Sequence, residues 1–227
     1  MNKLITAAAL AAGVVLGAGT ASASLLLDFT KSPSPALTGT FAGTGYTVEI
    51  FPLSSVPSFV PGAGPTCDSL TPLECTNDGI GIAAPPPAFP DDEISPGNER
   101  LVITFDDPVK LAGFWLLDLF RSNEDPDDIF ESAEYRLGDV GPSGSGWLSV
   151  DAEETFGGTS GVVFVDLQGA EWSKISFRSP VKAFGGDDLG VNDFAVAGIA
   201  AVPLPAGVLL LGLGLGGLAV YRRRQAA

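Results

Sequence analysis

The sequence contains no histidine, and its only methionine is the first residue. A Ser-His-Asp triad, a zinc helix with two histidine ligands, and haem held by histidine or methionine are therefore excluded. Positive charge is scarce as well, because 12 Lys and Arg stand against 27 Asp and Glu, for a net charge of -15. Such an acidic protein is repelled by nucleic acid and by anionic lipid, so we expect no nucleic-acid partner.

The remaining composition is that of a chain that folds with many turns. Of its 227 residues, 45% are hydrophobic, which suffices for one domain with a core. The 29 Gly and 18 Pro are numerous but stay below the level of low-complexity sequences. We expect a single compact module once the two terminal segments are set aside.

The N-terminal segment, residues 1–23, has the composition of a targeting sequence. It begins with Met-Asn-Lys, continues with an apolar run of small residues and ends in Ala21, Ser and Ala23. A short basic region, an apolar stretch and an Ala-x-Ala exit are the three parts of a secretory signal peptide. We predict that signal peptidase cleaves after Ala23, with a retained membrane anchor as the alternative.

The C-terminal segment, residues 202–227, combines a proline box with an apolar run and a basic end. Residues 204–221 carry no charge, and as a helix they would be about 27 Å long, just enough for a bilayer core. The arginines that follow would stay cytoplasmic by the positive-inside rule. The segment therefore predicts a transient inner-membrane anchor with the acidic middle of the chain facing outward.

A sorting signal is identifiable in this segment from Val202, Pro203, Leu204, Pro205 and Ala206, followed by the apolar run and by Arg222, Arg223 and Arg224. These residues resemble the VPLPA-type variant of the PEP-CTERM signal of Gram-negative bacteria. The resemblance implies that an exosortase-like membrane protease cuts near the box, so that the protein is exported to the cell surface or the extracellular space. It also implies an association with extracellular polysaccharide and biofilm matrix. A plain C-terminal anchor is the alternative.

The middle of the chain, residues 24–201, has the pattern of short strands. Stretches rich in β-branched and aromatic residues are bounded by Gly, Pro, Asp and Ser, and no long helical period occurs. We predict strands over residues 25–29, 46–51, 101–105, 111–120, 134–137, 147–150, 162–167, 175–178 and 191–199. This set predicts an all-β domain, an antiparallel β-sandwich of jelly-roll type, with an open meander as the alternative.

Residues 52–97 interrupt this pattern with many prolines, which predicts an irregular insertion. The only two cysteines, Cys67 and Cys75, lie within it. An even number of cysteines in an exported chain favours a disulfide, and one that closes a short loop contributes about 2 to 3 kcal/mol in the chain-entropy model. A redox-active pair is disfavoured, because the spacing is not Cys-x-x-Cys.

Two acidic stretches are candidate calcium sites. Residues 123–134 partly match the spacing of a twelve-residue calcium loop. Residues 185–196 resemble the penultimate turn and last strand of exported jelly-roll modules, some of which bind calcium there. The candidate ligands are Asp125, Asp127, Glu134, Asp187, Asp188 and Asp193. Solvated turns are the alternative for both stretches.

The aromatic residues offer a further candidate, a platform on which a sugar ring could stack. Its members would be Trp115, Trp147, Trp172, Tyr46 and Tyr135, although core packing is the alternative for each. No Gly-x-Ser-x-Gly elbow occurs. We therefore expect a non-enzymatic surface or matrix protein, structural or adhesive, with calcium and carbohydrate as candidate ligands. A carbohydrate-active enzyme that uses two carboxylates is the alternative.

Overall fold

The computed structural model describes residues 25–33, 35–52, 55–59, 72–77, 79–83, 93–121, 130–139, 146–155, 161–180 and 193–203. Every regular element among these residues is a β-strand, and the main sheet is antiparallel, which confirms the all-β expectation. None of the described residues belongs to a helix of the length and hydropathy that crossing a bilayer requires. Both predicted targeting segments, apart from Val202 and Pro203, lie outside the described residues.

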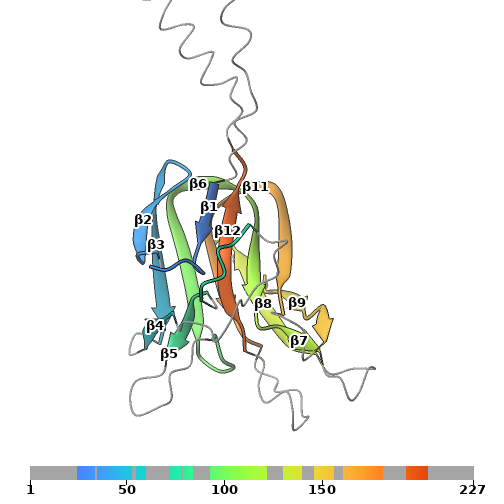
Figure 1. Ribbon diagram of the computed structural model, residues 1–227. Helices are drawn as coiled ribbons and strands as arrows, with labels where there is room; N and C mark the ends of the chain where they lie inside the picture. The colour runs from blue at the N-terminus through green and yellow to red at the C-terminus, as the bar shows by residue number, and fades with distance from the viewer. Residues whose placement is uncertain are drawn as a thin grey trace, which may run out of the picture. The chain divides into compact units, whose positions relative to one another are not determined.

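One eight-stranded sheet dominates the structure (Figure 1). In spatial order its main path is β1 (Leu25–Asp28), β12 (Ala195–Ala201), β6 (Arg100–Leu117), β11 (Val163–Arg178), β8 (Ser132–Leu137) and β9 (Leu148–Asp151). A second path leaves β6 through β3 (Thr44–Phe51) and β2 (Thr38–Phe41). Two small sheets pair β4 (Val56–Ser58) with β5 (Gly81–Ala83), and β7 (Phe120–Arg121) with β10 (Glu154–Thr155).

The long strands β6 and β11 pair along most of their length, and a register shift between Trp172 and Lys174 of β11 divides the sheet into two halves. The first half contains the start of β6 and the end of β11, together with β3 and β8. The second half contains the rest of β6 and β11, together with β12 and β1. The first half of β6 pairs with β3, and its second half pairs with β12. The sequence predicted two strands in place of each, 101–105 with 111–120 and 162–167 with 175–178, and this division was wrong. Residues 105–108 of β6, including Asp-Asp-Pro, form a bulge opposite Ser173, so these turn-forming residues do not end the strand.

The core lies on one face of the first half, because side chains alternate between the two faces of a strand. Leu101 and Ile103 of β6 and Ile175 and Phe177 of β11 are fully buried in one cluster. The same cluster includes buried residues of β12 in the second half, such as Ile199. The opposite face of the first half carries the intervening polar side chains, and the candidate site lies there.

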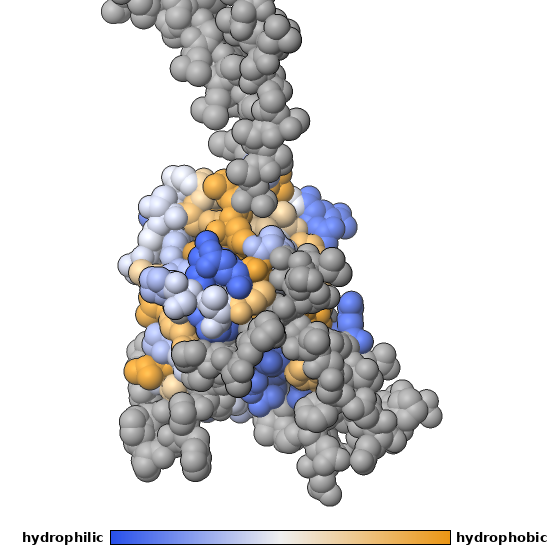
Figure 2. Space-filling view, in the orientation of Figure 1, coloured by the Kyte–Doolittle hydropathy of each residue, from blue (hydrophilic) through white to orange (hydrophobic). Residues whose placement is uncertain are grey.

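Apolar surface gathers at the end of the sheet where β1 begins and β12 ends (Figure 2). The exposed side chains of Leu25 and Val202 belong to this end. Among the described residues, the other large exposed apolar side chains, Val56, Leu148 and Phe164, come from separate strands. Single exposed apolar residues of this kind are ordinary in soluble domains.

The Pro-rich insertion, predicted to be irregular, contributes ordered segments to the domain. It supplies β4 and β5, and Ile80, Ile82 and Ile94 are fully buried in the main cluster. The buried carboxylate of Asp28 accepts hydrogen bonds from Thr30 N and Glu74 N, both at 2.9 Å, and so holds the segment 72–77 against β1.

The predicted Cys67–Cys75 disulfide falls within the same insertion. Cys75 is half-buried, and the described part of the chain contains no free cysteine. Cys67 lies outside the described residues, so the pairing stays a prediction.

Candidate functional site

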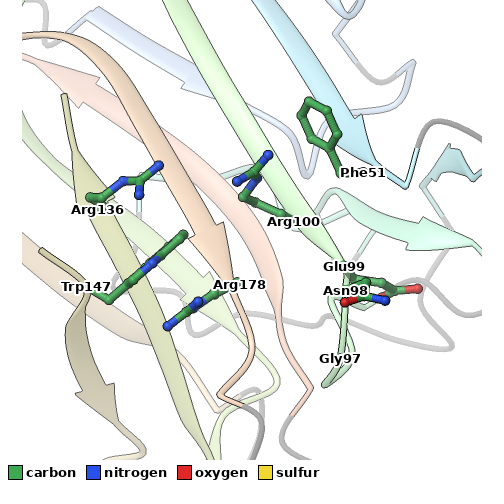
Figure 3. A pocket seen from close by; sticks show the side chains of 8 residues that line it. All are labelled: Phe51, Gly97, Asn98, Glu99, Arg100, Arg136, Trp147 and Arg178. Atoms are coloured by element: carbon green, nitrogen blue, oxygen red, sulfur yellow. The ribbon is translucent and has the colours of Figure 1, made fainter. Parts of the chain in front are cut away.

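A pocket of about 280 Å³ opens on the polar face of the first half of the sheet (Figure 3). We call it the arginine pocket, because three arginines contribute to its wall. The lining residues are Phe51, Gly97, Asn98, Glu99, Arg100, Arg136, Trp147 and Arg178. Three of the four arginines between residues 24 and 201 therefore lie in one place, in a chain that is otherwise strongly acidic.

Strand register brings these arginines together. Arg100 of β6 lies opposite Phe51 of β3, and Arg178 of β11 lies opposite Glu134 of β8. Arg136 is two residues along β8 from Glu134, so it projects from the same face. Since β6, β11 and β8 are neighbouring strands, the three guanidinium groups form a row across the sheet.

Aromatic rings and one carboxylate hold the guanidinium groups. Arg100 Cζ lies 4.5 Å from the centre of the Phe51 ring, while Arg136 Cζ and Arg178 Cζ lie 4.8 Å and 4.2 Å from Trp147. These distances are those of cation–π interactions. In Figure 3 the indole is seen close to edge-on, with Arg136 drawn on one side and Arg178 on the other. Each of the three guanidinium groups thus lies over an aromatic ring.

The three arginines differ in their charge partners. Arg178 Nε donates a hydrogen bond to Glu134 Oε2 at 2.6 Å, a charge-assisted bond that neutralises this guanidinium. The Nε atoms of Arg100 and Arg136 are buried and have no hydrogen-bond partner in the described structure. Ser176 Oγ, on the same face opposite Arg136, is also buried without a partner. Buried polar atoms are nearly all paired in folded proteins, so this cluster is unusual.

Of the six predicted calcium ligands, Glu134 and Asp193 lie among the described residues. Glu134 is engaged by Arg178. No group of three or more potential metal-ligating side chains occurs in the described part of the chain. The other four candidates, Asp125, Asp127, Asp187 and Asp188, lie outside the described residues, and their role stays a prediction.

The structure singles out a different acid, Glu131, which the sequence analysis did not. Its side chain is buried, and its Oε2 accepts a hydrogen bond from Phe120 N at 2.8 Å. The pKa of Glu131 is raised to about 7, chiefly by burial and to a smaller extent by the nearby charge of Asp193, while the hydrogen bond from Phe120 N acts in the opposite direction. This carboxyl group therefore retains its proton at mildly acidic pH.

The predicted aromatic platform does not form as one surface. Trp115 packs against Phe164, with the ring centres 4.6 Å apart. Trp172 packs against the main core, and Trp147 lies in the arginine pocket. The two tyrosines of the prediction are also core-packed: Tyr46 is buried, and Tyr135 lies edge-on to a buried phenylalanine. Core packing, the stated alternative, accounts for four of the five rings.

The arginine pocket was missed at the level of sequence because its members are far apart in the chain. The sequence nonetheless held an indication of it. Each of the three arginines, Arg100, Arg136 and Arg178, occupies a polar position in a strand, in a part of the chain with few other basic residues. Alternation assigns each arginine to a polar face. The alternation of side chains along a strand does not determine which strands are neighbours in the sheet.

Comparisons with known proteins assign this chain to no family. No family model and no curated protein matches the chain. Among solved structures, the X-ray structure of the GH31 CBM32-2 module bound to GalNAc is 14% identical over 49% of this chain and 68% of that one. Its TM-score of 0.24 is too low to establish a shared fold, and the bound GalNAc is a property of that module.

Proposed function

We propose that this chain is an exported protein of the cell surface or extracellular matrix whose outer domain, residues 24–201, binds polysaccharide. One observation carries the proposal: a preformed pocket with aromatic walls and three guanidinium groups on a rigid sheet face. Polar groups fixed against aromatic side chains suit the recognition of sugar hydroxyls and acidic substituents. We further infer that the two halves of the sheet form a sandwich of jelly-roll type.

The direct test is retention on polysaccharide. The full-length chain, purified in detergent, is mixed with insoluble matrix polysaccharide from a Gram-negative biofilm, and the bound fraction is measured after sedimentation. Trp147→Ala removes the ring that orients Arg136 and Arg178, so we expect about tenfold weaker binding. Phe164→Ala removes an exposed ring elsewhere and serves as the matched control. Equal binding by both variants and the parent chain would contradict a role for the pocket.

Sorting is the second part of the proposal, and the VPLPA-type box supports it. If an exosortase-like protease reads this box, replacing Pro203 and Pro205 by Ala blocks processing, and most of the chain stays in the membrane fraction at full length. The readout is an immunoblot of membrane and supernatant fractions from a producing bacterium. The control replaces two prolines outside the box, Pro126 and Pro142. Unchanged processing of the box variant would refute the sorting assignment and leave a plain anchor.

Binding rather than hydrolysis is proposed because of the carboxylates at the pocket. Glycosidases use two carboxyl groups that flank the scissile bond. Among the described residues, one carboxylate, that of Glu99, lines the arginine pocket, and its Oε2 accepts a hydrogen bond from Ser95 N at 2.8 Å. The nearby Glu134 is bonded to Arg178. This arrangement favours a binding site over a two-carboxylate enzyme.

A further inference from the structure

We infer that the arginine pocket recognises a carboxylate-bearing sugar, a uronic-acid unit of an acidic polysaccharide, through the guanidinium groups of Arg100 and Arg136. This inference rests on the proposed function, because it names the ligand class of the same site. Four features of the described residues support it: the pairing of the arginines, their orientation, the net charge of the site and the polar groups at the rim.

The pairing of the arginines shows which of them are available to an anion. Arg178 is bonded to Glu134 across neighbouring strands. Arg100 and Arg136 contact aromatic rings, and no carboxylate of the described chain is hydrogen-bonded to either. Asp139, which is bonded to Lys174, interacts with Arg136 electrostatically but without a hydrogen bond. Because both side chains line the pocket, an anion bound there would supply the missing carboxylate partner. Arg178 then acts as a positioning residue, and the other two contact the ligand.

The orientation of these two arginines reduces the entropic cost of binding. Arg100 is stacked on Phe51 and Arg136 on Trp147, and both emerge from paired strands rather than loops. A guanidinium held in this way presents its planar fork to a carboxylate without losing much further side-chain freedom. Carboxylates match this fork with two parallel hydrogen bonds.

The net charge of the site favours a singly charged ligand. Among the described residues, the three guanidinium groups and Lys174 are matched by three carboxylates, those of Glu99, Glu134 and Asp139, which leaves one excess positive charge. A uronate carries one negative charge for each ring, whereas a phosphate or a densely sulfated chain would bring more charge close to Glu99. The net charge of -15 over the whole chain also opposes the binding of a polyanion with a high charge density.

The polar groups at the rim suit the rest of a sugar ring. The Glu99 carboxylate can accept hydrogen bonds from hydroxyl groups, and the exposed Asn98 amide can both donate and accept. Simple carboxylates such as acetate have no hydroxyl groups that could form hydrogen bonds with these two residues. The volume of about 280 Å³ is near the lower end of known ligand pockets, which fits one or two sugar units.

The test compares acidic oligosaccharides with their own methyl esters, which differ only in the charge of the carboxyl group. Oligomers of galacturonate, glucuronate and mannuronate, each beside its ester, are titrated by calorimetry into the full-length chain in detergent. We expect at least one acid to bind about tenfold or more tightly than its ester. Sulfated dextran beside plain dextran tests whether any anion suffices, and we expect the sulfated chain to bind more weakly than the preferred uronate.

Variants separate a direct role of the arginines from a structural one. Arg100→Gln and Arg136→Gln should each reduce the ratio of acid to ester affinity about tenfold, because each removes a charge-assisted hydrogen bond. Lys110→Gln removes the same charge from an exposed side chain that is ion-paired to Glu171 outside the pocket, and the ratio should stay within twofold. A general loss of folding would lower both affinities and leave their ratio unchanged.

Failure of the uronate inference and failure of the proposed function would give different results in these experiments. Equal affinity for acid and ester, or tighter binding of sulfated dextran, would overturn the uronate assignment while polysaccharide binding stands. Failure of all three acids at millimolar concentration, with matrix polysaccharide still retained, would overturn it as well. If the chain retained no polysaccharide in either assay, the proposed function itself would fail. An unchanged acid-to-ester ratio in both arginine variants, with both affinities equal to those of the parent chain, would remove the pocket as the site of recognition.

Discussion

Replacing Phe114 by Ala is expected to lower the free energy of unfolding by about 3–5 kcal/mol. Phe114 is fully buried in β6, and its ring meets those of Tyr135 and Phe177 edge-on, with ring centres 5.0 Å apart in both pairs. The three rings come from β6, β8 and β11, so alanine would leave a cavity where three strands meet. Domains of this size are stable by about 5–15 kcal/mol, so the loss is a large fraction of the total.

Chemical denaturation followed by tryptophan fluorescence measures this effect. The matched control is Phe164→Ala, the same change at a side chain that is 46% exposed and touches Trp115 alone among the ring pairs of the described residues. We expect a loss of about 1 kcal/mol there, the value of one aromatic pair. Phe114→Leu should fall between the two, because leucine fills part of the cavity. Equal losses at positions 114 and 164 would contradict the placement of Phe114 in the core.

Stability should fall as pH rises from about 4.5 to 7, and Glu131→Gln should remove much of this dependence. The pKa of Glu131 is raised from 4.5 to about 7 in the folded protein, chiefly by burial. Below pH 4.5 both states hold the proton, and the contribution to stability is fully present. Between 4.5 and 7 the unfolded state releases the proton and the folded state keeps it, so stability is lost until both are ionised.

The glutamine variant keeps the oxygen that accepts from Phe120 N but cannot ionise. It should match the parent chain near pH 4.5 and exceed its stability at pH 8 by about 1–3 kcal/mol, the scale of burying a polar group without full compensation. Thermal unfolding is followed at several pH values in chelator, so that no cation can offset the carboxylate. Glu153→Gln is the control, because Glu153 is an exposed acid next to Ala152, whose N–H donates a hydrogen bond to the backbone carbonyl of Glu131. A constant difference between parent and variant across pH would mean that Glu131 is solvated.

Local alternation located several strands but not their full extent. Residues 101–105 and 175–178 alternate clearly in the sequence, and both lie within strands of the structure. The longer strands β6 and β11 were not predictable, because Asp-Asp-Pro at 106–108 and Gln168 with Gly169 are ordinary turn signals. The structure absorbs both as bulges, with Gln168 at φ 54° and Gly169 at φ 73°. Pairing with a neighbouring strand outweighs local turn preference there.

The calcium and platform hypotheses show a second limit of sequence reasoning. Both grouped residues by kind or by closeness in the chain. Glu134 instead pairs with Arg178, 44 residues away in the chain, and the aromatic residues are distributed between the core and the arginine pocket. A side chain in a strand is paired chiefly with its cross-strand neighbours, and those neighbours are set by the topology of the sheet.

Two properties could be inferred from the amino-acid sequence alone: the chemistry that the protein excludes and its structural class. The absence of histidine rules out several catalytic centres, and short apolar stretches between turn residues specify the all-β fold of the described residues, since both properties are local. Which polar positions share a surface became evident from the arrangement of the strands. Arg100, Arg136 and Arg178 meet because β6, β11 and β8 are neighbours in a definite register, and register is a long-range property of the folded sheet.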